Sequence, residues 1–191
     1  MGAQPSIIGA SEAIGNEWRR VTVQRMPDIV APDMVANRSR PRGIIPTLYY
    51  EDVAKAIDWL CGAFGCAERF RYGPQDHVAG AQLTAGDGVV MLSVARVGQS
   101  PRWEDKAEFG PPRDREVTVV LSVHVEDVDQ HFERAQQFGA RIVHEPETYN
   151  FGERQYTAED VAGYRWSFSQ SISDVAPEEW GATTGPHLAE R

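Results

Sequence analysis

The chain has 191 residues, of which 41% are hydrophobic and 25% charged, and a formal net charge of −9. This composition is ordinary for a globular protein, and the length suffices for one compact unit or two small modules. The acidic balance argues against nucleic acid or an anionic membrane as the main partner, because both require a basic patch. The N-terminus lacks the pattern of a signal peptide, and no segment reads as a membrane span. We therefore expect a cytoplasmic protein.

Residues 1–42 read as an N-terminal arm, and a first module follows over residues 43–97. The module opens with an apolar strand at 44–50. Asp52 is a good helix N-cap, because its carboxylate can accept hydrogen bonds from the free amides of the first turn. Apolar residues then recur at helical spacing up to Phe64, before Gly65. Further strands are predicted at 67–72, 77–84 and 89–94.

A polar loop over residues 98–116 leads to a second module over residues 117–171. Its predicted elements repeat the order of the first: a strand at 117–125, a helix capped by Asp127, and strands at 141–144, 153–158 and 164–169. The apolar face of this helix is predicted to consist of Val128, Phe132, Ala135 and Phe138. Residues 172–191 form an acidic C-terminal tail.

Two sequence motifs recur at one spacing, which indicates an internal duplication. Glu51-Asp52-Val53 returns as Glu126-Asp127-Val128, 75 residues later. Gly88 and Gly163, which open the last strand of each module, are also 75 residues apart. The sequence therefore predicts an α+β fold made of two tandem βαβββ modules.

The duplicated motifs, together with Phe-Gly at the end of both helices, resemble the vicinal oxygen chelate superfamily. This superfamily includes glyoxalase I, bleomycin-resistance proteins, fosfomycin-resistance enzymes and extradiol dioxygenases. The stretch over residues 152–170 looks like the closing motif of its PhnB-like, bleomycin-resistance-like branch. The resemblance implies a curved, cup-shaped mixed sheet that holds the ligand, with helices on the convex face. It also implies a homodimer, with each cup built within one chain or across two chains.

The resemblance also identifies four positions that carry metal ligands in metal-dependent members. In this sequence they correspond to Ile45, Leu92, Val120 and Ser167. Three aliphatic side chains and one hydroxyl cannot hold a divalent ion, which needs imidazole or carboxylate ligands. We therefore expect no metal and no other cofactor.

Strand periodicity sorts the remaining side chains between the cup and the helices. Alternation places Val120, Ser122 and His124 in the cup, and likewise Arg165, Ser167 and Ser169. The first module is expected to contribute Ile45, Thr47, Tyr49, Val90, Leu92 and Val94. Its half of the cup is therefore predicted to be the more apolar one.

The candidate site residues follow from this sorting. His124 and Tyr49 are candidate acid–base groups, because an imidazole titrates near neutral pH and a phenol can donate a proton. Arg165 and Arg154 are candidates for gripping an anionic group, and aromatic rings at Trp103 and Tyr156 can stack on a planar ligand. The remaining candidate ligand-binding residues are Thr47, Ser122 and Ser167.

Several functions fit these residues. The first hypothesis is a metal-free protein that binds a small organic molecule in the cup. The alternative is a metal-free isomerase, lyase or cyclase that uses His124 or Tyr49. A metal-dependent glyoxalase-like enzyme or dioxygenase requires ligands at positions other than those compared above.

Overall fold

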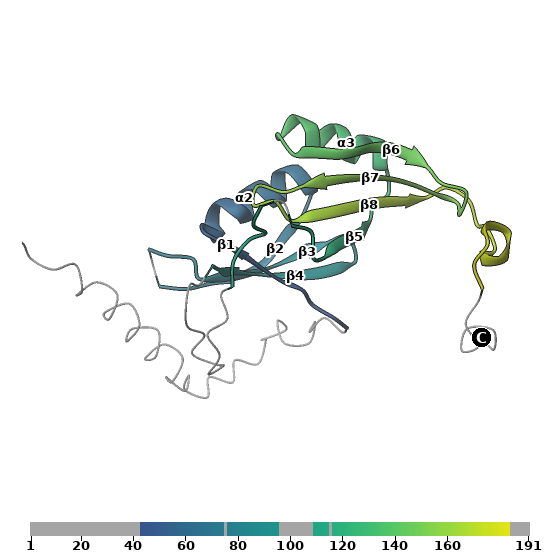
Figure 1. Cartoon of the computed structure of the whole chain (residues 1–191). Helices are drawn as coiled ribbons and strands as arrows, with labels where there is room; N and C mark the ends of the chain where they lie inside the picture. The colour runs from purple at the N-terminus through teal and green to yellow at the C-terminus, as the bar shows by residue number, and fades with distance from the viewer. Residues whose placement is uncertain (1–42, 75, 96–108, 115, 184–191) are drawn as a thin grey trace, which may run out of the picture. The chain divides into compact units, whose positions relative to one another are not determined.

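Figure 1 shows the computed structural model of the chain, which describes residues 43–74, 76–95, 109–114 and 116–183. All of them belong to one compact unit, 41–191. The predicted N-terminal arm, Trp103 and most of the loop over 98–116 lie outside the described residues.

The first module contains four strands and one helix in the predicted order. Strand β1 is followed by helix α2 and then by three consecutive strands. Their bounds are Thr47–Tyr50 for β1, Val53–Phe64 for α2, Ala67–Tyr72 for β2, Gly80–Ala85 for β3 and Gly88–Val94 for β4.

The second module repeats this order and is followed by one short 3-10 helix, η2. The bounds are Val120–His124 for β5, Val128–Gln137 for α3, Arg141–Thr148 for β6, Glu153–Glu159 for β7, Arg165–Ser171 for β8 and Pro177–Trp180 for η2. The structure thus confirms the α+β class and the two tandem modules. Strand β6 extends four residues beyond its predicted end, whereas β5 starts three residues later than predicted.

The two helices begin for the same local reason. The carboxylate of Asp52 accepts a hydrogen bond from the Lys55 amide at 3.1 Å, and Asp127 accepts one from the Gln130 amide at 2.9 Å. Each bond satisfies an amide that has no partner within its helix. Helix α2 ends at Gly65, whose φ of +64° is in the left-handed region that glycine tolerates.

The eight strands form two separate four-stranded mixed sheets, in the orders β1-β4-β3-β2 and β5-β8-β7-β6. In each sheet the first strand of the module pairs in parallel with the last, and the other pairings are antiparallel. Strands β1 and β5 are therefore edge strands in the part of the chain that the structure describes.

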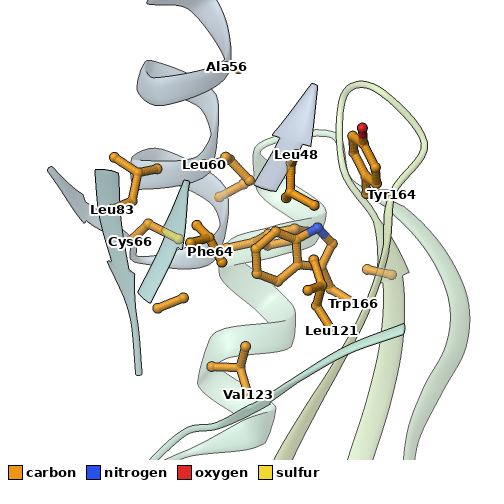
Figure 2. Close-up of a cluster of buried hydrophobic side chains, with 14 of the residues drawn as sticks. Leu48, Ala56, Leu60, Phe64, Cys66, Leu83, Leu121, Val123, Tyr164 and Trp166 are labelled. Atoms are coloured by element: carbon orange, nitrogen blue, oxygen red, sulfur yellow. The ribbon is translucent and has the colours of Figure 1, made fainter. Parts of the chain in front are cut away.

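Side chains from both modules pack into one hydrophobic core. Helices α2 and α3 contact each other, and Phe64 at the end of α2 lies 5.5 Å from Trp166 and 4.8 Å from Phe168, measured between ring centroids. Figure 2 shows Phe64 beside Trp166, with Leu83 and Leu121 contributed by different sheets. Each sheet thus turns one face toward this shared core.

The turns between strands close the contact between the modules. Gly86, in the β3–β4 turn, lies so close to β5 that an added Cβ would come within 2.7 Å of the His124 carbonyl oxygen. Its φ of +54° also favours glycine. At the opposite end of the module contact, the Tyr50 hydroxyl donates to the Asp160 carboxylate at 2.6 Å.

Candidate functional site

The outer face of the second sheet, which points away from the core, is polar. Ser122 pairs in register with Ser167, and Ser167 pairs with Thr157. Directly paired residues share one face of a sheet, whereas Trp166 and Phe168 between them are buried. This polar face consists of Val120, Ser122, His124, Arg165, Ser167, Ser169, Gln155, Thr157, Glu159, Arg141, His144 and Glu147.

The outer face of the first sheet is richer in aromatic and apolar side chains. Phe70 and Tyr72 on β2 are both 48% exposed. The Tyr72 ring covers Gly80, where an added Cβ would come within 2.3 Å of the Tyr72 hydroxyl. This aromatic face consists of Thr47, Tyr49, Phe70, Tyr72, Gln82, Met91 and Ser93.

The predicted orientation of β4 is wrong by one residue. Val90 and Leu92 are 4% and 0% exposed and belong to the core, so they do not face the cup. Thr47 pairs with Met91, whereas its counterpart Ser122 pairs with Ser167, so the equivalent positions on the last strands are 76 residues apart. The constant 75-residue offset therefore fails within the module, where helix α3 is shorter than α2.

A charged group crosses the polar face where β8 begins. Arg165 donates from Nη2 to Glu159 Oε1 at 2.7 Å, and Arg141 donates from Nε to Glu159 Oε2 at 2.6 Å. A second contact joins Arg141 Nη2 to Glu159 Oε1. The hydrogen bond from Arg141 lowers the pKa of Glu159, and Arg165 acts in the same direction. Glu159 is therefore an ionised carboxylate held between two arginines.

Of the predicted catalytic residues, His124 lies exposed on the polar face and Tyr49 lies half-buried on the aromatic face. The Tyr49 ring packs 5.1 Å from Phe109, and its backbone amide donates to the Tyr164 hydroxyl at 2.8 Å. Of the predicted ligand-binding residues, Thr47, Ser122, Arg165 and Ser167 lie on these outer faces.

Two predicted ligand-binding residues point toward the helices instead. Tyr156 is 1% exposed, and its hydroxyl lies 2.6 Å from His131 Nδ1 in the core. Arg154 forms a two-pronged ion pair with Asp129 on helix α3. Both occupy even-numbered positions of β7, whereas the outward side chains of that strand are odd-numbered.

Sequence reasoning did not identify several side chains on these faces as site residues. Phe70 and Tyr72 alternate along β2 and lie beside Gln82 and Gly80 of β3. Strand alternation was the available signal for these two residues. His144 was harder to place, because register shifts interrupt β6 on both sides of it.

A family model described as the Glyoxalase/Bleomycin resistance protein/Dioxygenase superfamily matches residues 44–168. The match covers both βαβββ modules and excludes most of the residues outside them. The chain belongs to this superfamily.

Similar proteins agree with this membership. An uncharacterised protein of Mycobacterium tuberculosis, Rv0887c, is 30% identical over 135 residues, which cover 70% of this chain and 77% of the relative. The structure of TioX from Micromonospora sp. ML1 aligns with a TM-score of 0.54 at 28% identity, over 71% of this chain and all of TioX. A superfamily structure from Nocardioides shares the fold, with a TM-score of 0.52 at 16% identity, over 90% of this chain and 99% of that one.

The corrected register bears on the superfamily's metal positions. The outer-face residue of β4 is Met91, and the corresponding residues of β5 and β8 are Val120 and Ser167. None of the three is a carboxylate or imidazole of the kind that divalent ions prefer. Among the residues that the structure describes, no group of three or more His, Cys, Asp or Glu is placed to hold a metal.

A cavity of about 570 Å³ lies at the contact between the modules. It is bounded by the end of α2, the β3–β4 turn, the end of β5 and the start of α3, including Phe64, Asp87, His124 and Arg134. Its lining does not include the central residues of the polar face, Ser122 and Ser167. No helix within the described ranges meets the length and hydropathy needed to cross a membrane.

Proposed function

We propose that the protein binds a small organic molecule between an aromatic face and a polar face, without a metal ion. The observation that carries this proposal is the contrast between the two outer faces. Phe70 and Tyr72 offer apolar surface, whereas the second sheet offers hydroxyl, imidazole and guanidinium groups. Apolar walls with a few convergent polar groups are typical of small-molecule sites.

We further propose that a second copy of the chain completes the cup. The two sheets share one core, and residues on both outer faces stay open to solvent in the single chain: Val120 is 47% exposed and Phe70 is 48% exposed. The edge strands β1 and β5 also remain open within the described residues. An aromatic face of one copy set against a polar face of the other produces a site with both chemistries.

A thermal-melting screen against aromatic organic compounds tests the binding proposal. A ligand that binds only the folded state raises Tm, and at 100 times its Kd it adds about 2.7 kcal/mol of stability. Ser167→Trp, which fills the middle of the polar face, is expected to abolish the rise. Val161→Trp is the control, because Val161 lies in the β7–β8 turn and is 59% exposed.

Treatment with a chelator tests the metal-free part of the proposal. Binding of a compound found in the screen is expected to survive EDTA followed by desalting. Loss of binding after chelation, with recovery on adding back a divalent ion, contradicts the metal-free proposal while leaving small-molecule binding intact.

A second candidate function is metal-free acid–base catalysis by His124. Its side chain is exposed on the polar face and forms no hydrogen bond with another described residue. A compound that is transformed by the wild type, and that binds His124→Ala with unchanged affinity but turns over about 10² to 10⁴ times more slowly, supports this function. Binding without transformation in both proteins supports the first proposal.

A further inference from the structure

Three rows of paired side chains cross the polar face, and they differ in charge. The first row, at the start of β8, contains Val120, Arg165, Glu159 and Arg141. The second contains Ser122, Ser167, Thr157 and His144. The third contains His124, Ser169, Gln155 and Glu147. Adjacent rows are two residues apart along the strand, so the first and third rows are separated by about 13 Å.

The first row carries two positive charges and one negative charge. Both carboxylate oxygens of Glu159 already accept hydrogen bonds from arginine, so this residue cannot neutralise the second guanidinium. The Nε of Arg165 is buried and has no hydrogen-bond acceptor among the described residues. A buried donor without an acceptor costs free energy. The row therefore has an excess of donors and of positive charge.

The second row adds neutral hydrogen-bonding groups beside the arginines. The hydroxyls of Ser122, Ser167 and Thr157 form no hydrogen bond to another side chain in the described part of the molecule. They adjoin Arg165 and Glu159 along the strands. In the third row, Glu147 is an exposed carboxylate. The face thus changes from cationic to neutral to acidic along the strands.

We infer that the polar face binds an organic anion whose carboxylate or phosphate group lies on Arg165 and Arg141. Guanidinium groups bind such groups through paired, charge-assisted hydrogen bonds. Glu159 acts as a positioning residue, because it holds both arginines on the same face of the sheet. The hydroxyls of the second row then contact the body of the ligand. This inference rests on the proposed function and adds the charge of the ligand to it.

Three probes of the same size test the inference on the full chain: naphthalene-2-carboxylate, 2-naphthamide and 2-naphthylmethylammonium. Titration calorimetry measures the Kd of each. The carboxylate is expected to bind at least about tenfold more tightly than the neutral amide, and the ammonium compound most weakly. Arg165→Gln is expected to remove the preference for the carboxylate, while binding of the amide changes by less than about threefold.

Arg154→Gln is the matched control. It removes the same charge from the adjacent strand of the same sheet, but Arg154 lies on the opposite face with Asp129. It is expected to leave the preference for the carboxylate intact. Arg165→Lys keeps the charge without the paired geometry, and should retain part of the preference. Thermal melting of each variant identifies any loss of folding.

The possible results separate the inference from the proposed function. If the amide or the ammonium compound binds the wild type as tightly as the carboxylate, the inference is wrong and the proposed function stands. Equal loss of the preference in Arg165→Gln and Arg154→Gln also overturns the inference, because the effect then follows net charge. If no probe binds and the thermal-melting screen finds no ligand, both fail.

Discussion

The buried carboxylate of Asp160 accepts hydrogen bonds from both modules. Tyr50 of the first module donates to it at 2.6 Å, and the Trp166 indole of the second donates at 3.1 Å. The amides of Ala162 and Tyr164 also donate to it. Burial raises the pKa of Asp160, although these donors act in the opposite direction. The residue therefore connects β1 to the β7–β8 turn.

Asp160→Ala is expected to lower the free energy of unfolding by about 3 to 5 kcal/mol, because it leaves several buried donors without an acceptor. Urea denaturation measures the change. Asp174→Ala is the control, since Asp174 is an exposed carboxylate, and its effect should stay within about 0.5 kcal/mol. Equal stabilities of the two variants would contradict a structural role for Asp160.

His131 is a second buried polar residue at the module contact. The sequence predicts a solvated helix position, but its Nε2 lies 3.1 Å from the Phe64 carbonyl oxygen. A carbonyl only accepts, so Nε2 carries the proton and Nδ1 accepts from the Tyr156 hydroxyl. Burial lowers the pKa of His131, and the charge of Arg134 lowers it further.

This pKa predicts a stability change with pH. The unfolded state takes up a proton near pH 6.5, before the folded state does, so the free energy of unfolding falls as the pH drops below about 6.5. His131→Gln is expected to reduce this slope by up to about 1.4 kcal/mol per pH unit. Urea denaturation between pH 5 and 8 measures it. His124→Gln, at an exposed histidine, should keep the wild-type slope, and an unchanged slope in His131→Gln contradicts the prediction.

At the scale of single elements, the end of α2 joins the two modules. Phe64 lies on the last turn of α2 and packs against Trp59 of its own helix and against Trp166 and Phe168 of β8. Phe138, predicted to be buried on α3, is instead 53% exposed, and its ring lies against Gly62 of α2. The helix contact therefore uses aromatic rings opposite small residues.

Phe64→Ala is expected to cost about 3 to 5 kcal/mol, because the deletion leaves a cavity where side chains from both modules meet. Phe70→Ala removes the same ring from the exposed aromatic face and should change the stability by less than about 0.5 kcal/mol. Urea denaturation measures both variants. Similar losses in the two variants would show that burial does not distinguish these positions.

Strand alternation succeeded where a strand pairs without interruption. It correctly placed Ser122 and His124 outward and Trp166 and Phe168 inward. It failed for Leu92, because its orientation was transferred from the other module across helices of unequal length. A shift of one residue reverses the face of a strand residue. Parity within one strand is thus a stronger guide than an offset between modules.

At the scale of the whole molecule, the proposed dimer predicts an effect of charge at Val120. In the free chain this side chain lies exposed on edge strand β5, beside Arg165. Val120→Lys is expected to convert a dimer to a monomer, because the interface would bury an unpaired ammonium group. Val161→Lys is the control at an exposed turn. Sedimentation velocity measures both, and a monomeric wild type contradicts a cup formed across two chains.

The amino-acid sequence by itself determined the two βαβββ modules, since the caps at Asp52 and Asp127 and the periodicity of apolar residues act over short distances. It also determined the superfamily resemblance and the absence of metal-ligand residue types at the compared positions. Only the tertiary structure decided that His131 and Tyr156 are buried together, and that Arg165, Glu159 and Arg141 form one row. The physical reason is that strand register and the packing of helix on helix bring together residues that no local pattern relates.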